Sequence, residues 1–266
     1  MNYSHIIRKN AAGLINKNIT VCVGIMLFYF AIDIIRSLLS EISGFLFNNM
    51  TAVSNTIQQS LYWLITIFIF SPLVIGIYRW FWRLTLDVKD NISEIFYYFS
   101  SRQFYKKALL LSLIETLLLL PAYFLAYFTN EFNLITISSR QGDGPTHMQS
   151  NAIMFQMWNV MLFLTLSIIS IWLMYRFFLS KFLIFNDEAL TAKGAFKLSF
   201  KMMKGNVTKA IGFSLGYIGW ILLSVLIIPK VYTTPLLFTG QAIFAQSLMI
   251  KYNYRLKTEG AYYAGV

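Results

Sequence analysis

Residues 19–39 read ITVCVGIMLFYFAIDIIRSLL, and this apolar run decides the fold of the chain. A membrane-spanning helix needs about 20 mostly apolar residues, because each residue adds about 1.5 Å towards a hydrocarbon core about 30 Å thick. The run has that length and follows the cations Arg8, Lys9 and Lys17. It continues too far for a secretory signal and lacks a small-residue cleavage site, so it predicts a first spanning helix whose N-terminus lies inside.

The composition extends this interpretation to the whole chain. Of its 266 residues, 57% are hydrophobic and only 12% are charged, and the mean hydropathy is +0.60. A soluble domain carries about 25% charged residues. The net charge is +11, but the cations flank apolar runs, which favours anionic lipid headgroups over nucleic acid as the partner. We therefore expect membrane lipids, and no nucleic acid, around this protein.

Six apolar runs are long enough to cross a bilayer. They cover residues 19–39, 61–83, 107–128, 153–178, 210–228 and 234–250. The runs are continuous rather than alternating, which favours helices over barrel strands. The predicted fold is all-α: one polytopic membrane helix bundle over residues 1–266, with about six transmembrane helices. The last two runs are expected to form a tight hairpin around Pro229, Lys230 and Pro235.

The positive charges test this count independently. If the chain crosses six times from an inside N-terminus, 19 of its 22 Lys and Arg residues fall on the inside. The other three are Arg36, Arg140 and Lys230. Cytoplasmic loops carry an excess of Lys and Arg, so this distribution predicts a multi-pass plasma-membrane protein with both termini in the cytoplasm.

Two of the inside loops are predicted to form amphipathic helices. The first begins at Asp90 and reads DNISEIFYYFSSRQFYKK. Asn91 and Glu94 have the spacing of a capping box, in which each side chain bonds to the backbone of the other residue. Four apolar side chains of this segment share one helical face: Ile92, Ile95, Phe96 and Phe99.

The second amphipathic helix is basic and covers residues 191–205, which read TAKGAFKLSFKMMKG. At about 100° per residue its four lysines fall within one narrow arc. They are Lys193, Lys197, Lys201 and Lys204. Gly205 is placed to end the helix. We expect the helix to lie in the headgroup plane with its lysines on anionic lipid. Docking of a cytoplasmic partner such as an ATPase, or of another membrane protein, is the alternative.

Three stretches carry a family resemblance. They are SPLVIGIYRWFW at residues 71–82, AFKLSFKMMKGN at residues 195–206 and GYIGWILLSVLIIP at residues 216–229. Together they resemble an uncharacterised bacterial integral-membrane family, a domain of unknown function, which is itself similar to the membrane domain of some glycerophosphodiester phosphodiesterases. The resemblance implies a helix bundle in a bacterial plasma membrane and no activity. The chain departs from the family's pattern at residues 230–232, where an aromatic motif is usual.

Glu115 is the sharpest functional candidate. It lies about eight residues, or roughly 12 Å, inside the third run from its cytoplasmic end. A carboxylate at that depth costs several kcal/mol unless it is paired, protonated or solvated. It is therefore either part of a proton or cation relay or a substrate contact, or a structural partner of Arg79 or Arg176. Both arginines lie near cytoplasmic ends of predicted spans.

The other candidates inside the spans have structural and functional readings. Asp33 and Arg36 are three residues apart and can pair on one helical face, or form an outward-facing binding site. Pro72 should kink the second span, and Pro121 the third, since proline removes a backbone hydrogen bond. Such kinks are static in most proteins and gate a pathway in some.

No catalytic, metal or cofactor motif is present in the sequence. Zinc-protease, serine-hydrolase and phosphate-loop patterns are all missing. His5 and His147 lack ligand neighbours, and Cys22 is the single cysteine. We expect a non-enzymatic membrane protein without metal or cofactor, one that handles an amphipathic or lipid-like molecule in export or immunity. The alternative is a scaffold that organises anionic lipid or partner proteins through its basic helix.

Overall fold

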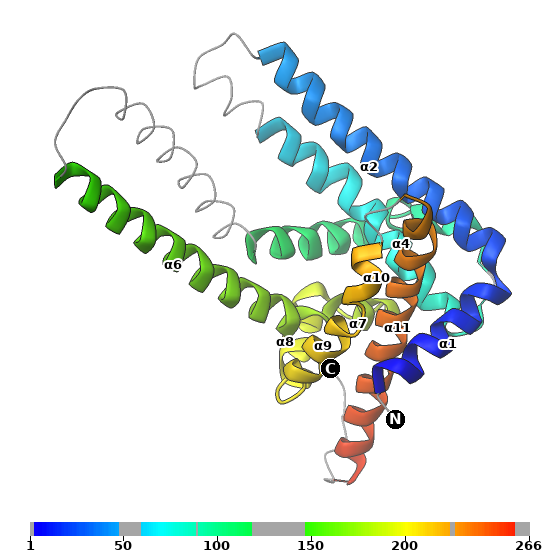
Figure 1. Cartoon of the computed structure of the whole chain (residues 1–266). Helices are drawn as coiled ribbons and strands as arrows, with labels where there is room; N and C mark the ends of the chain where they lie inside the picture. Colours follow the sequence, from blue (N-terminus) through cyan, green and yellow to red (C-terminus); the bar gives the residue numbers. More distant parts are fainter. Residues whose placement is uncertain (1–2, 48–59, 89, 119–146, 224–226, 259–266) are drawn as a thin grey trace.

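A computed structural model describes residues 3–47, 60–88, 90–118, 147–223 and 227–258, and every regular element within these ranges is helical (Figure 1). The first half contains α1 (Tyr3–Lys17), α2 (Ile19–Phe47), η1 (Thr66–Phe70), α4 (Ser71–Leu84), η2 (Ile92–Phe99) and a helix that covers residues 102–118. The second half contains α6 (His147–Phe177), α7 (Ser180–Asn186), α8 (Ala192–Met202), α9 (Val207–Leu215), α10 (Ile218–Leu223) and α11 (Ile227–Thr258). The all-α prediction is confirmed.

Three of the described helices are long and apolar enough to cross a membrane. They are Ile19–Ile42, Ser60–Leu84 and Val160–Asn186, and they coincide with the first, second and fourth apolar runs. The third run continues beyond residue 118, outside the described residues. The count of six spans therefore stays a prediction.

The fifth and sixth runs fold differently from the prediction. The helix breaks between α9, which ends at Leu215, and α10, which begins at Ile218. The expected position of the hairpin turn, at Pro229, Lys230 and Pro235, is wrong, because all three residues lie inside the single helix α11, which packs against α10. Proline is tolerated in the first turn of a helix, where its missing N–H would have no helical partner, and Pro229 is the third residue of α11. Proline alone was therefore a poor sign of a turn here.

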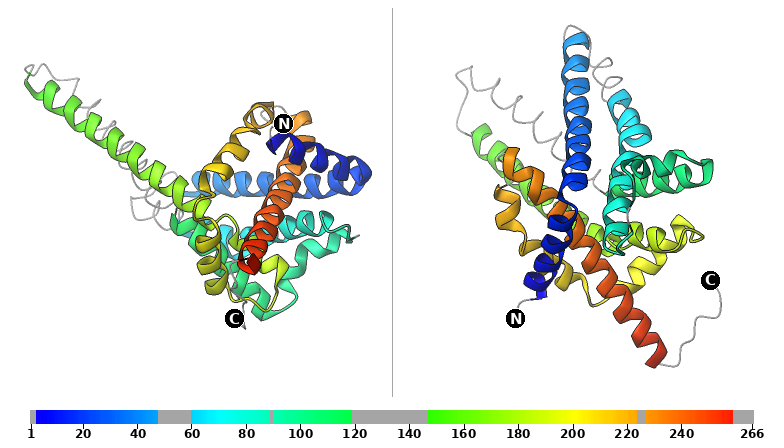
Figure 2. Two further views of the ribbon diagram at one scale, coloured as in Figure 1. Left: turned by 90° about the horizontal axis from the view of Figure 1, so that it is seen from below. Right: turned by 90° about the vertical axis from the view of Figure 1, so that its right-hand side faces the viewer.

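The N-terminal helix α1 packs across α11 and reaches the break between α9 and α10 (Figures 1 and 2). Ile7, Ala11 and Ile15 recur every four residues, which places them on one face, and all three are buried. At the break, the Arg8 guanidinium donates a hydrogen bond of 3.0 Å to the carbonyl oxygen of Gly216. This bond supplies a partner for a carbonyl near the end of a helix.

The second candidate span contains a local irregularity ahead of Pro72. In η1 the chain forms a π-helical turn, and the Ser71 amide donates to the carbonyl oxygen of Thr66, five residues earlier. Such turns are uncommon and often lie at functional sites. The kink expected at Pro72 stays a prediction, and Pro121 lies outside the described residues.

The first amphipathic segment packs closely on α4. A Cβ added to Gly76 would lie 1.9 Å from the carbonyl oxygen of Ile95, so only glycine allows this approach. The segment is the 3₁₀ helix η2, which buries Ile95 and Tyr98 and leaves Ile92, Phe96 and Phe99 exposed. The capping box is wrong, because the Asn91 side chain makes no capping bond and the Glu94 carboxylate pairs with Arg79.

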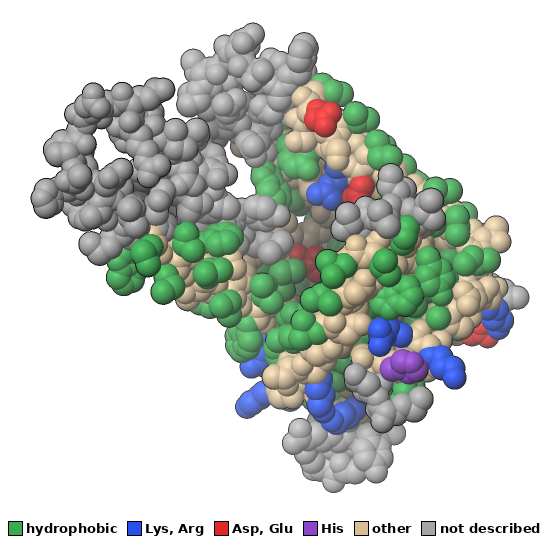
Figure 3. Space-filling view, in the orientation of Figure 1, with side chains coloured by type: hydrophobic (Ala, Val, Ile, Leu, Met, Phe, Trp, Pro, Cys, Tyr) green, Lys and Arg blue, Asp and Glu red, His purple; other side chains and the backbone are tan. Residues whose placement is uncertain are grey.

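Helix α6 projects away from the rest of the molecule (Figure 1). Its C-terminal part contacts α8 and α9, but Trp158, Met161 and Ile168 are between 63% and 70% exposed. In Figure 3 hydrophobic side chains cover this helix, whereas most visible Lys and Arg side chains lie on the lower part of the molecule. An exposed surface of large apolar side chains is suited to contact with lipid or with another protein.

Candidate functional site

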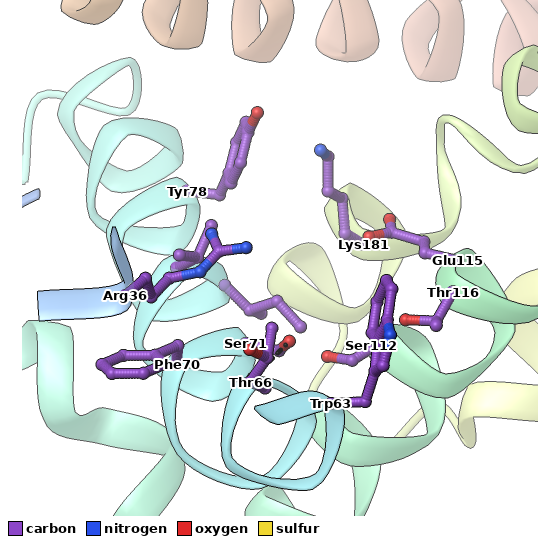
Figure 4. A pocket seen from close by; sticks show the side chains of 12 residues that line it. Arg36, Trp63, Thr66, Phe70, Ser71, Tyr78, Ser112, Glu115, Thr116 and Lys181 are labelled. Carbon is purple, nitrogen blue, oxygen red and sulfur yellow. Dashed lines mark hydrogen bonds between the residues drawn. The ribbon is translucent and has the colours of Figure 1, made fainter. Parts of the chain in front are cut away.

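A cavity of about 320 Å³ lies among α2, the Ser60–Leu84 helix, residues 102–118 and α7 (Figure 4). Its walls combine aromatic and aliphatic side chains with three of the formally charged types. These three residues are Arg36, Glu115 and Lys181. Figure 4 shows Arg36 and Glu115 on opposite sides of this cavity, with Lys181 beside Glu115. The cavity therefore offers both signs of charge inside an apolar enclosure.

Lys181 is positioned by an aromatic ring as well as by charge. Its ammonium nitrogen lies 3.6 Å from the centroid of the Tyr78 ring, within the range of a cation–π interaction. The Tyr78 ring in turn lies 4.3 Å from that of Phe238 on α11. The lysine thus enters the cavity from α7 and is held against α4 and, through Tyr78, α11.

Hydroxyl groups line the part of the cavity next to the π-helical turn. The Ser71 hydroxyl donates to the carbonyl oxygen of Thr66 at 3.0 Å, and the Ser112 hydroxyl donates to that of Ala108 at 2.9 Å. Thr66 is only 8% exposed, and its hydroxyl has no hydrogen-bond partner within the described residues. A buried hydroxyl without a partner costs free energy, and a bound molecule would supply the missing hydrogen bond.

Neither predicted arginine pairs with Glu115. Arg79, only 3% exposed, donates hydrogen bonds of 3.0 Å to the carboxylates of Glu94 and Glu188. Its guanidinium carbon lies 3.4 Å from the centroid of the Tyr97 ring. The described contacts of Arg79 are thus with Glu94, Glu188 and Tyr97 rather than with Glu115.

Loop residues complete the arginine's environment and change the acidity of Glu188. Burial raises the pKa of the Glu188 carboxyl, but hydrogen bonds from Tyr97 and Arg79 outweigh it, so the net pKa is lowered. Burial raises the pKa of the Tyr97 phenol, and its hydrogen bond to Glu188 adds to this shift. The Lys107 ammonium also donates to the backbone carbonyl of Glu188. The network joins α4, η2 and the loop after α7.

Arg176 is also engaged elsewhere. It donates a hydrogen bond of 3.3 Å to the carbonyl oxygen of Phe200, and its guanidinium lies over the rings of Trp172 and Phe200. The Ser199 hydroxyl donates to the carbonyl oxygen of Arg176 at 2.9 Å. These contacts attach the end of α6 to α8. The described contacts thus pair neither arginine with Glu115, and whether Glu115 has a structural or a functional role stays a prediction.

Asp33 and Arg36 form an ion pair on α2, in which Asp33 Oδ1 lies 3.9 Å from Arg36 Nη1. Asp33 also lies 3.8 Å from the ammonium nitrogen of Lys230 on α11. Arg36 in addition lines the Glu115 cavity. The Asp33 carboxylate pairs with the Arg36 guanidinium, and Arg36 also lines the cavity. The pair can therefore have a structural role and a role in binding at the same time.

A family described as a protein of unknown function, DUF975, matches residues 5–266. This chain belongs to the DUF975 family. No curated protein and no solved structure matches it. The family match covers the stretches that carried the resemblance, but nothing in the comparisons supports the expected similarity to the membrane domain of glycerophosphodiester phosphodiesterases.

The basic helix of this DUF975 protein is α8. Thr191 caps it, since its hydroxyl accepts a hydrogen bond of 3.1 Å from the Gly194 amide, and Gly205 beyond its end has a φ of +80°. Its apolar face packs on the protein, with Ala195, Phe196 and Met202 buried. All four lysines of the predicted arc are exposed: Lys193, Lys197, Lys201 and Lys204.

Sequence reasoning missed Lys181, Thr66, Glu94 and Glu188 as members of these sites. One signal was present, because Lys181 interrupts the apolar stretch FFLSKFLIF at residues 177–185. Thr66 and Glu188 gave none, since threonine is common in spans and Glu188 lies in a polar loop, and the spacing of Glu94 indicated a capping box instead. Within the described part of the DUF975 chain, no group of three His, Cys, Asp or Glu residues could hold a metal ion.

Proposed function

We propose that this DUF975 protein is a non-enzymatic component of the bacterial plasma membrane, and that it binds an amphipathic, lipid-like molecule in the Glu115 cavity. It crosses the membrane about six times with both termini in the cytoplasm, as the distribution of Lys and Arg predicts. Its role is in export of, or immunity to, that molecule.

The observation that carries the proposal is the composition of the cavity wall. Trp63, Phe70 and Ile75 provide an apolar surface, and Arg36, Glu115 and Lys181 provide charges of both signs. Binding sites for small molecules are mostly apolar with a few placed polar groups. Ionisable residues within spans mark functional sites by default. The Thr66 hydroxyl, which has no hydrogen-bond partner in the part of the chain that the structure describes, adds a position where a ligand could bond.

The decisive experiment is to identify what accompanies the protein out of the membrane. The protein is extracted with a polymer that keeps surrounding lipid, and bound small molecules are identified by mass spectrometry. Glu115→Gln and Lys181→Gln should each reduce the specific molecule at least tenfold, because each removes a charge from the cavity. Glu41→Gln on α2 is the matched control, since Glu41 is exposed and does not line the cavity. An identical set of bound molecules in all four proteins would refute the proposal.

The scaffold function is the second candidate, and the exposed lysines of α8 favour it. A partner protein such as a cytoplasmic ATPase would then use this helix. Purification in mild detergent should yield a stoichiometric partner that is lost when all four lysines are changed to glutamine. Unchanged recovery of that partner from the fourfold variant would exclude α8 as its docking site.

A further inference from the structure

A second cavity, of about 590 Å³, lies between α7, α8 and the C-terminal half of α11, and it shares no lining residue with the Glu115 cavity. Its floor is apolar, since Leu183, Met202 and Met249 line it and are buried. Its rim is polar and exposed, and it includes Asn186 and Asn253.

Two of the four lysines of the basic segment line this cavity, and a third, Lys204, lies just beyond the end of α8. Lys197 and Lys201 are four residues apart, so they are neighbours on one helical face. Lys193 and Lys204 belong to the same exposed arc but do not line the cavity. The basic segment therefore has one pair of lysines inside the cavity lining and one pair outside it.

The charges of the lining favour an anion. Asp187 is the one carboxylate among the lining residues, and its Oδ1 already accepts a hydrogen bond of 2.9 Å from the Ala189 amide. Gly194, in the first turn of α8, also lines the cavity, and that turn contains no acidic residue. The positive end of the helix dipole thus adds to the two ammonium groups.

The kind of anion follows from the rest of the lining. Lysine ammonium groups and amide nitrogens are donors to phosphate oxygens. The buried leucine and methionines of the floor suit an apolar group attached directly to the phosphate. We propose that this cavity binds the phosphate headgroup of an anionic lipid, with Lys197 and Lys201 on the phosphate and the first part of the lipid's apolar body on the floor.

This site is independent of the Glu115 cavity. It requires two defined lysines rather than the net charge of the helix, and that requirement makes it testable. Diffuse attraction between a basic helix and an anionic membrane depends on how many charges are present near the surface and little on which ones they are.

The test uses the full-length protein in a nonionic detergent and dihexanoyl phosphatidic acid as the probe, with binding measured by isothermal titration calorimetry. The double variant Lys197→Gln with Lys201→Gln should bind at least tenfold more weakly. The double variant Lys193→Gln with Lys204→Gln loses the same charge and should bind within twofold of the unaltered protein. Lys197→Arg with Lys201→Arg should restore most of the affinity, because the positive charges return.

Three results would overturn the proposal. Equal losses in the two glutamine pairs would mean diffuse electrostatic attraction. Binding of uncharged dihexanoylglycerol as tightly as the phosphatidic acid would remove the role of the phosphate. Inorganic phosphate that displaces the probe at the probe's own concentration would show that free phosphate, and not a lipid, is the ligand.

Discussion

Arg79 and Glu188 are 109 residues apart in the sequence, and a hydrogen bond of 3.0 Å joins their side chains. Because Arg79 also binds Glu94, one buried guanidinium connects α4, the η2 segment and the loop after α7. This side chain thus forms one of the links between the two halves of the chain. Nothing in either local sequence indicates this contact.

Loss of this guanidinium should destabilise the protein. In Arg79→Met both carboxylates lose the guanidinium, although Glu188 keeps its hydrogen bond from Tyr97. Glu94 and Glu188 are also more than a third exposed, so water replaces part of the interaction. We expect a cost of about 1–2 kcal/mol, which lowers the melting temperature by several degrees. Melting in detergent, followed by tryptophan fluorescence, measures the change. Lys17→Met, which removes an exposed ion pair with Asp87, should melt like the unaltered protein.

The same network should make stability depend on pH. The folded-state pKa of Glu188 lies below its usual 4.5, so its ionised form is stabilised by folding. That contribution is fully present above pH 4.5 and is lost as the pH falls through the lowered folded-state value. The melting temperature should therefore decrease as the pH is lowered from about 5.5 to about 3.5. In Glu188→Gln the decrease should be smaller, and an identical decrease would argue against the assigned role.

Gly76 should tolerate no side chain. In Gly76→Ala the new methyl group would lie 1.9 Å from the backbone carbonyl oxygen of Ile95, which cannot rotate away. The η2 segment must then move off α4, at a cost of about 3 kcal/mol or more. Gly13→Ala is the control, because Gly13 lies within α1 with nothing within 4 Å of the added atom. It should be neutral or stabilising by up to about 1 kcal/mol. Yield and melting temperature distinguish the two variants.

Cysteine labelling should establish on which side of the membrane the loops of the protein lie. Cys22 is the single cysteine and is 1% exposed, so a membrane-impermeant maleimide should leave the native protein unlabelled. Lys204→Cys introduces an exposed thiol at the end of the basic segment and should react in inside-out vesicles but not in intact cells. Arg140→Cys, predicted to lie outside, should show the reverse. Labelling of Lys204→Cys in intact cells would invert the proposed topology.

The sequence predicted the elements whose cause is local. Hydropathy located the three long apolar helices, because their length and composition are properties of one continuous segment. The 3.6-residue period likewise predicted α8, with its lysines exposed.

The features that the sequence did not predict depend on contacts between segments far apart in the chain. The break before Ile218 is stabilised by Arg8 from the opposite end of the chain. Glu94 satisfied a capping pattern by spacing, but a buried arginine is a stronger partner for a carboxylate than a backbone amide is. The neighbour of Glu115 proved to be Lys181, which spacing along one helix could not reveal.

The packing of α1 against α11 has a consequence for biosynthesis. Arg8 and Gly216 are 208 residues apart, and α11, which packs against α1, is translated later still. At about 5–20 residues per second, the ribosome needs roughly 10–40 s to deliver that partner after α1 has emerged. During this interval the insertion machinery or the bilayer surface must shelter the apolar side of the first helix.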